Sequence, residues 1–177
     1  MNTVPSIEEL RAAIRNVPDF PKPGIQFKDI TPVLADARLF SGCIDHLING
    51  FKPGDVDMVV GIDARGFIFA AAAALRLRAG FVPVRKTGKL PFDTHEQSYD
   101  LEYGQSTIAI HIDAVLPGAR VLLIDDLLAT GGTAEAAALL LGKVGAKILQ
   151  AAFFIELSGL QGRQKIAHCP VRSLVVY

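Results

Sequence analysis

Short apolar runs alternate along the chain with segments of helical spacing. The apolar runs predict buried strands, because a parallel strand covered on both faces loses its polar alternation. They occupy residues 57–62, 80–85, 120–126, 147–155 and 171–177. Apolar residues three and four positions apart predict helices, which cover residues 6–16, 36–51, 67–77 and 134–141. Strands that alternate with helices predict an α/β fold with a mainly parallel central sheet flanked by helices.

Proline and glycine interrupt this pattern. Residues 18–24 contain three prolines and a glycine, which disfavour regular structure and predict an ordered arm. Residues 86–97 are polar and predict a mobile loop, while 98–104 and 106–111 predict β-structure around a turn. We therefore expect an N-terminal helix and arm at 1–34 and a core at 35–177, with a flexible loop at about 86–104.

Composition and charge exclude several classes of protein. Half of the 177 residues are hydrophobic, which suits a folded domain with a large core. The 18 basic and 18 acidic residues balance, so nothing indicates binding to nucleic acid or to an acidic membrane. Cys43 and Cys169 form no metal or redox motif, which predicts reduced thiols in a cytoplasmic protein. We see no signal peptide, and no apolar run reaches the roughly 18 residues of a membrane span.

The strand at 120–126 carries the clearest chemistry. It ends in Asp125 and Asp126 and leads through a loop of small residues into a helix. The loop residues are Ala129, Thr130, Gly131, Gly132 and Thr133. Such a loop lets backbone N–H groups approach a phosphate, and the helix dipole favours the anion. We also expect Thr133 to cap the helix, as Ser6 caps the first helix of the chain.

The motif is neither of the two common nucleotide-binding loops. No lysine follows Gly132, which excludes a nucleoside-triphosphate P-loop, and GxGxxG is absent. Because carboxylates accept hydrogen bonds from hydroxyls, Asp125 and Asp126 suggest a phosphorylated ribose as ligand. The alternative is a plain strand–turn–helix with solvated acids.

Two other loops follow strands at the expected ligand-binding edge of the sheet. Asp63-Ala64-Arg65-Gly66 follows the strand at 57–62, and three cations, Arg85, Lys86 and Lys89, lie at and just after the end of the strand at 80–85. Ligands of parallel sheets bind beyond the carboxyl ends of the strands, where cations stabilise a polyphosphate. From the residues alone, Arg65 could equally form a local salt bridge, and the cations could form a solvated turn.

Residues 121–133 resemble the phosphoribosyl-pyrophosphate signature of the type I phosphoribosyltransferases. The similarity to the adenine-specific branch of that family runs from about residue 18 to residue 177. It implies that Ala129 to Thr133 hold the 5′-phosphate of 5-phosphoribosyl-1-pyrophosphate (PRPP), and that Asp125 and Asp126 face the ribose hydroxyls.

The same resemblance implies a site for the pyrophosphate. Arg65 would contact it, together with Arg85, Lys86 and Lys89, some of which reach the partner's site in dimers of the family. Family members often have a non-proline cis peptide, which would fall here near Asp63–Ala64.

The loop that ends at Ser98–Gly104 resembles the flexible catalytic loop of the family. A lid would exclude water from an oxocarbenium-like centre. The resemblance implies that Glu102 transfers a proton as adenine reacts through N9. Asp93, His95 and Glu96 lie in the variable part of the loop and receive no role.

Residues 19–32 resemble the base-binding hood of the family. Phe27 would stack on the purine, backbone groups near Gln26 would read the adenine edge, and Lys28 would lie at the rim. Family members often carry an apolar residue and an arginine where Gln26 and Lys28 stand, and recognition by the backbone would survive these differences. From the arm alone, an ordinary core aromatic is the better interpretation of Phe27. Residues 156–163 are similar to the closing segment of the family.

Taken together, the resemblance implies transfer of the phosphoribosyl group from PRPP to adenine N9, giving AMP and pyrophosphate in purine salvage. It implies a homodimer and Mg²⁺ held mainly by PRPP oxygens, without a firmly predicted protein ligand. Two alternatives stay open. One is a phosphoribosyltransferase for another purine base, against which only the hood argues. The other is a non-catalytic PRPP sensor, against which Glu102 and the basic loop argue.

Overall fold

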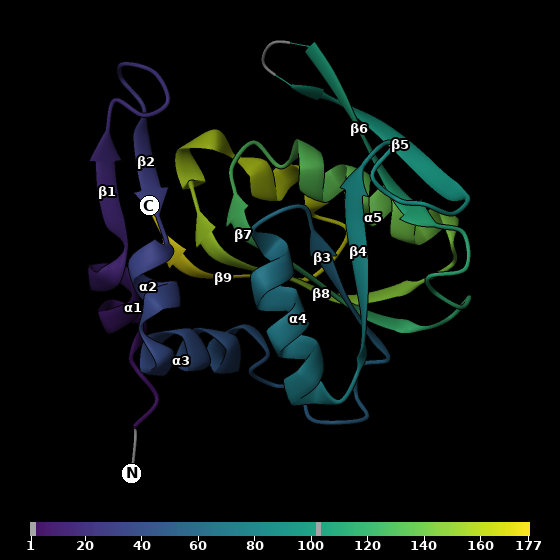
Figure 1. The fold of residues 1–177 in the computed structure, drawn as a ribbon, viewed down its shortest axis with the longest axis horizontal. Coiled ribbons are helices and arrows are strands. Elements are labelled where there is room, and N and C mark those ends of the chain that lie inside the picture. Colours follow the sequence, from purple (N-terminus) through teal and green to yellow (C-terminus); the bar gives the residue numbers. More distant parts are fainter. Residues whose placement is uncertain (1–2, 102–103) are drawn as a thin grey trace. The chain divides into compact units, whose positions relative to one another are not determined.

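The structure, a computed structural model, describes residues 3–101 and 104–177 (Figure 1). The chain forms two compact units that divide after His46, whereas the sequence suggested a division after Leu34. Each unit is described by itself.

The first unit begins with helix α1 (Ile7–Ala13). Ser6 caps it as expected, since its Oγ accepts a hydrogen bond from the Glu9 amide and Glu9 Oε2 accepts one from the Ser6 amide. The helix is shorter than the predicted 6–16. Arg15 and Asn16 lie instead in strand β1 (Arg15–Pro18), because the chain pairs there with β2 (Gln26–Asp29).

The predicted arm is therefore the turn of a β-hairpin. The strands are antiparallel, and Pro18 lies in β1, paired with Gln26. In the turn, Phe20–Pro21 is a cis peptide and Asp19 Oδ1 accepts a hydrogen bond from the Gly24 amide at 2.7 Å. The prolines thus bound and shape a turn between two strands. The helices after it are α2 (Thr31–Ala35) and α3 (Ala37–Leu47).

The second unit is built on a seven-stranded sheet in the order β5-β6-β4-β3-β7-β8-β9. Five neighbouring strands, β4, β3, β7, β8 and β9, pair in parallel, and the β5–β6 hairpin adds an antiparallel edge. The predicted α/β class with a mainly parallel sheet is confirmed. The strands are β3 (Met58–Ile62), β4 (Gly80–Lys86), β5 (Thr94–Leu101), β6 (Gly104–His111), β7 (Arg120–Leu128), β8 (Lys147–Glu156) and β9 (Val171–Val176). The helices are α4 (Gly66–Leu77) and α5 (Gly132–Lys143), with 3₁₀ turns η1 (Ser158–Leu160) and η2 (Gly162–Ile166).

Helices α4 and α5 cover opposite faces of the central strands. Val60 and Ile62 of β3 belong to the buried cluster that contains Leu140 of α5. Gly61 points the other way, where a Cβ would lie 2.7 Å from Cβ of Ala70 in α4. Because neighbouring residues of a strand face opposite sides, both faces are buried. This burial explains the unbroken apolar runs in the sequence.

The β5–β6 hairpin corrects the expected extent of the mobile loop. Thr94 to Gln97 were expected in the loop but belong to β5, where Thr94 pairs with His111 and Gln97 with Ile108. The Lys143 ammonium also donates a hydrogen bond to the Glu96 carbonyl at 2.8 Å. An edge strand with a solvated face carries polar residues, which hid it in the sequence. No helix in the described part of the chain combines the length and apolarity that a membrane crossing needs.

Candidate active site

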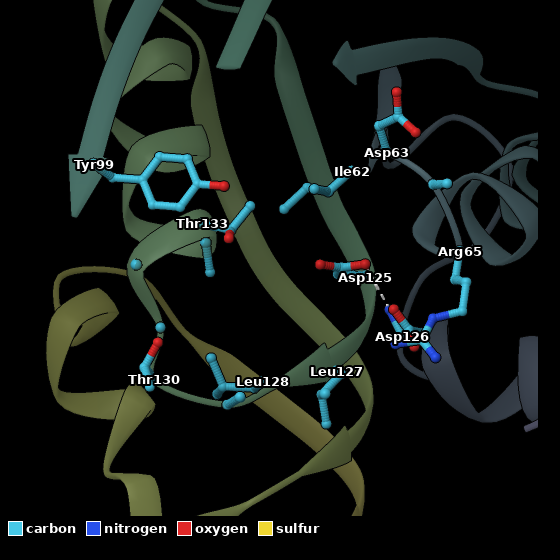
Figure 2. Close-up of a pocket in the computed structure, with 15 residues that line it drawn as sticks. Ile62, Asp63, Arg65, Tyr99, Asp125, Asp126, Leu127, Leu128, Thr130 and Thr133 are labelled. Atoms are coloured by element: carbon cyan, nitrogen blue, oxygen red, sulfur yellow. Dashed lines mark hydrogen bonds and ion pairs between the residues drawn. The ribbon is translucent and has the colours of Figure 1, made fainter. Parts of the chain in front are cut away.

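A cavity of about 360 Å³ lies beyond the carboxyl ends of β3 and β7 (Figure 2). It brings together residues that the sequence singled out in two separate loops. These are Arg65, Asp125, Asp126, Ala129, Thr130, Gly131, Gly132 and Thr133. Parallel strands end at the same edge of a sheet, so segments some 60 residues apart in sequence meet there.

The loop after β7 presents backbone donors to this cavity. Gly131 is the N-cap of α5, with φ at +81°, a left-handed conformation that favours glycine. Within the described residues, the amides of 130–134 donate no backbone hydrogen bond, and the first amide to do so, that of Glu135, reaches the Gly131 carbonyl. Open amides at a helix N-terminus form a ready anion site.

Thr133 does not cap α5, contrary to expectation. It is the second residue of the helix, and no side chain caps the helix. Gly131 can take a left-handed conformation, so the helix begins two residues earlier than the sequence suggested. Thr130 and Thr133 both line the cavity, where their hydroxyls are available to a ligand (Figure 2).

Asp125 and Asp126 lie at the centre of the site. The Asp126 amide donates a hydrogen bond to Asp125 Oδ1 at 2.8 Å, and Arg65 Nε lies 2.8 Å from Asp126 Oδ2. Burial raises the pKa of Asp125 well above its ordinary value, and the charge of Asp126 raises it further. Burial also raises the pKa of Asp126, while the Arg65 guanidinium opposes that rise.

Gly66 lets the start of α4 approach these acids. A Cβ at this position would lie 2.6 Å from Asp125 Oδ1 and 3.1 Å from the Ile124 carbonyl oxygen. No side chain larger than hydrogen fits there without displacing the β7 strand end. The loop after β3 and the acids of β7 are thus in direct contact.

The loop after β3 contains the expected backbone feature, because Asp63–Ala64 is a non-proline cis peptide. Asp63 Oδ2 accepts a hydrogen bond from Arg85 Nε at 2.9 Å, which ties this loop to the end of β4. Arg85 also donates to the Lys89 carbonyl at 3.1 Å. Arg85, Lys86 and Lys89 are not among the residues that line the cavity, and their contact with pyrophosphate stays a prediction.

Tyr99 is a cavity residue that the sequence analysis missed. Its half-buried ring comes from β5 and points into the cavity toward Thr133 (Figure 2). A Cβ on Gly132 would lie 3.2 Å from Tyr99 Cδ2. The one sequence signal was an aromatic residue in a polar segment. Tyr99 therefore links the β5–β6 hairpin to the start of α5.

The predicted base-binding residues lie on β2 of the first unit. Gln26 and Lys28 share a face of the strand and are joined through Asn16 of β1. Asn16 Nδ2 donates to Gln26 Oε1 at 2.6 Å, and Lys28 Nζ donates to Asn16 Oδ1 at 3.1 Å. Phe27 faces the other way, and its ring meets that of Phe20 edge-on at 5.1 Å. Base binding by these residues stays a prediction.

Two further predictions concern groups that the structure does not test. Glu102 lies outside the described residues, so its role in proton transfer stays a prediction.

Among the described residues, no group of three or more His, Cys, Asp and Glu is arranged to hold a metal ion. The site instead offers Asp125 and Asp126, of which the second is engaged by Arg65. Two carboxylates suit Mg²⁺ that keeps waters and substrate phosphates as its main ligands.

Comparison with known proteins agrees with this geometry. Residues 28–175 match the phosphoribosyl transferase domain family. An adenine phosphoribosyltransferase of Acidothermus cellulolyticus is 56% identical over 170 residues, which cover 96% of each chain. The crystal structure of the Rhodothermus marinus adenine phosphoribosyltransferase is 53% identical with a TM-score of 0.91, covering 97% of this chain and 98% of that one. The Saccharomyces cerevisiae enzyme, crystallised with adenine and an imino-altritol bisphosphate, is 40% identical with a TM-score of 0.90, covering 95% and 97%. The chain belongs to the adenine phosphoribosyltransferases.

Proposed function

We propose that this chain transfers the phosphoribosyl group of PRPP to N9 of adenine and releases AMP and pyrophosphate. The single observation that carries the proposal is the cavity in which the open amides of 130–134 lie beside Asp125 and Asp126. A 5′-phosphate and the hydroxyls of one ribose need these two groups side by side. The family of the chain supports adenine as the acceptor base.

The phosphate loop and the acids position the sugar. Ala129 to Thr133 hold the 5′-phosphate through main-chain donors and the hydroxyls of Thr130 and Thr133. Asp125 and Asp126 accept hydrogen bonds from the 2′- and 3′-hydroxyls. Holding the sugar at two points fixes C1′ relative to the incoming base, which lowers the entropic part of the barrier.

The basic residues stabilise the leaving group. The bond between C1′ and the pyrophosphate oxygen breaks, and the electron pair leaves with the oxygen. Arg65, with Arg85, Lys86 and Lys89 at the end of β4, stabilises the negative charge that develops. Mg²⁺, bound mainly through PRPP oxygens, contributes further charge neutralisation when present.

Adenine then bonds to C1′ through N9 and loses the N9 proton. Glu102, in the segment between β5 and β6, accepts a proton as charge moves through the purine ring. Phe27 of the hood stacks on the base, the backbone near Gln26 reads its edge, and Lys28 lies at the rim. The segment of about 86–104, which includes strand β5, excludes water during the transfer.

We further propose that the enzyme is a cytoplasmic homodimer that serves purine salvage. Cys43 and Cys169 are buried and form no disulfide, which suits a reducing compartment. A dimer also offers a use for Arg85, Lys86 and Lys89 at the end of β4, which do not line the cavity of their own chain. Each protomer would supply some of them to its partner.

The test is turnover with four bases in parallel. Purified protein is mixed with Mg²⁺, PRPP and either adenine, guanine, hypoxanthine or xanthine, and nucleotide and pyrophosphate are measured. We expect AMP from adenine alone. Glu102→Ala should abolish the product, whereas Glu96→Ala, which removes an exposed glutamate of β5, should retain it.

Other outcomes lead to the two alternatives. Product from another purine would keep the phosphate site and contradict the base assignment. Tight PRPP binding without product from any base would identify a sensing module. Equal loss in Glu102→Ala and Glu96→Ala would contradict the assigned role of Glu102.

A further inference from the structure

The segment that follows β8, Leu157 to Ile166, packs against the phosphate loop, which is Ala129–Thr133. This segment is called the wall below. A Cβ on Gly162 would overlap the Ala129 carbonyl oxygen and lie 2.8 Å from the Gly131 nitrogen. The approach is reciprocal, because a Cβ on Gly131 would overlap the Gly162 carbonyl oxygen. Gly162 thus packs backbone against backbone with Gly131 of the loop.

An ion pair between the buried Glu156 and the partly exposed Arg163 fixes this wall to the sheet. Glu156 ends β8 and is only 6% exposed, yet the proposed chemistry does not use it. It accepts two hydrogen bonds from Arg163, at 2.5 Å from Nη2 and 3.1 Å from Nε. Arg163 also donates to the Val171 carbonyl at 3.0 Å and to Ser173 Oγ at 3.2 Å, both on β9. A guanidinium with four such contacts holds one geometry.

Two other contacts complete the brace. The Leu157 amide donates to the Leu128 carbonyl at 2.9 Å, where β7 enters the phosphate loop. Ile166, at the end of η2, is fully buried in the core cluster beneath α5. The wall is therefore fixed at Leu157 and at Ile166. Gly162 lies between these two residues and packs against the loop.

We propose that Gly162 and the Glu156–Arg163 ion pair are positioning residues that keep the loop Ala129–Thr133 in its phosphate-binding shape. The inference rests on the proposed function, which places the 5′-phosphate in that loop. Main-chain donors recognise an anion only when the backbone has the right curvature. A brace that contacts the loop from behind sets that curvature without touching the ligand.

The decisive experiment compares two glycines of the same segment. Gly162→Ala introduces a Cβ against the Ala129 carbonyl, whereas a Cβ on Gly159 meets no atom within 4 Å. Ribose 5-phosphate binding is measured by titration calorimetry, and KM for PRPP and for adenine by turnover. Gly162→Ala should weaken ribose 5-phosphate binding and raise the PRPP KM by about tenfold to a hundredfold, the scale expected of an ångström-sized misplacement. The adenine KM should change far less, and Gly159→Ala should match the wild type.

The ion pair provides an independent second test if Gly162→Ala fails to fold. Arg163→Met should weaken ribose 5-phosphate binding, and Arg163→Lys, which restores one charge-assisted bond, should recover part of it. Wild-type affinity in folded Gly162→Ala, or in folded Arg163→Met, would overturn the inference. An equal loss in Gly159→Ala would overturn it as well.

The two proposals fail in different ways. Wild-type protein that does not bind ribose 5-phosphate contradicts the proposed function, and the inference falls with it. Wild-type protein that binds ribose 5-phosphate while Gly162→Ala and Arg163→Met bind it equally well contradicts the inference alone.

Discussion

Arg65 Nε lies 2.8 Å from Asp126 Oδ2, so the loop after β3 and the acid pair of β7 are electrostatically coupled. Burial raises the pKa of Asp126, and the positive charge of Arg65 lowers it. Arg65→Gln should therefore raise that pKa further and shift the acid limb of the pH profile of kcat/KM for PRPP to higher pH. We expect kcat/KM for PRPP to fall by about tenfold or more, since charged hydrogen bonds contribute about 1.5–3 kcal/mol.

A matched variant separates this effect from a general loss of positive charge. Arg76→Gln removes an arginine from the far end of α4, in its last turn. It should leave the pH profile unchanged. An acid limb that stays in place in Arg65→Gln would contradict the coupling.

The Asp125 carboxylate should lower the free energy of unfolding while it contributes to PRPP binding. Burial raises its pKa well above the ordinary value, so the folded state binds its proton more tightly than the unfolded state does. The free energy of unfolding therefore falls as pH rises through the folded pKa. Asp125→Asn should raise Tm at pH 8 and lower PRPP affinity, and its gain in Tm should shrink as the pH is lowered toward 4.

Thermal unfolding between pH 4 and pH 8 checks this prediction. Asp113→Asn removes an exposed acid and controls for net charge. A Tm for Asp125→Asn below that of the wild type at pH 8 would show that a hydrogen bond of the carboxylate outweighs its burial.

Asp57 should contribute to stability above pH 4 and lose that contribution in acid. It precedes β3 and accepts three hydrogen bonds from Arg120 at the start of β7. The Arg120 guanidinium and amide lower the pKa of Asp57 from 3.8 to about 2. A lowered pKa stabilises the fold above the unfolded value, and the effect disappears as pH falls toward the folded value. Asp57→Asn should have a lower Tm than the wild type at pH 6, and the two should converge near pH 2. A gap that persists at pH 2 would contradict the electrostatic cause.

Substitutions on the two faces of β2 should differ in their effect on KM for adenine. Phe27→Leu should raise KM for adenine by roughly three- to tenfold, because an aromatic contact contributes about 0.5–1.5 kcal/mol beyond its buried area. Gln26→Ala should change it little, since the proposed base contact is made by backbone groups near Gln26 and the Gln26 amide side chain is bonded to Asn16. Neither variant should change KM for PRPP. Steady-state kinetics with each substrate varied in turn checks this prediction. A larger rise in KM for adenine in Gln26→Ala than in Phe27→Leu would contradict the assignment.

The sequence predicted those parts of the fold whose signal is local. The strand 120–126, its two acids and the loop of small residues follow one another in sequence, so residue type and order were enough. Thr94–Gln97 and Arg15–Asn16 were assigned wrongly because they are strands only through pairing with distant partners, such as Thr94 with His111 and Asn16 with Lys28. Polar residues on an edge strand carry no periodic pattern that predicts the pairing.

Site residues divide in the same way. Asp125, Asp126 and Arg65, which line the cavity, were singled out because charged groups at the ends of strands are conspicuous in the sequence. Tyr99 and Gly162 were not, since each reaches the phosphate loop through tertiary packing. Thr133 was expected to cap α5, and only the left-handed backbone of Gly131 shows why the helix begins earlier.

The open amides of residues 130–134 also determine how this enzyme can lose function. A contact made by main-chain atoms is not deleted by shortening a side chain, so alanine scanning would not detect the anion contacts proposed for these amides. Damaging changes should instead be enlargements, at Gly66, Gly131 and Gly162, where an added carbon meets the backbone or the Asp125 carboxylate. Genetic variation in this protein should therefore be tolerated or rejected by volume around the phosphate loop and by charge elsewhere in the site.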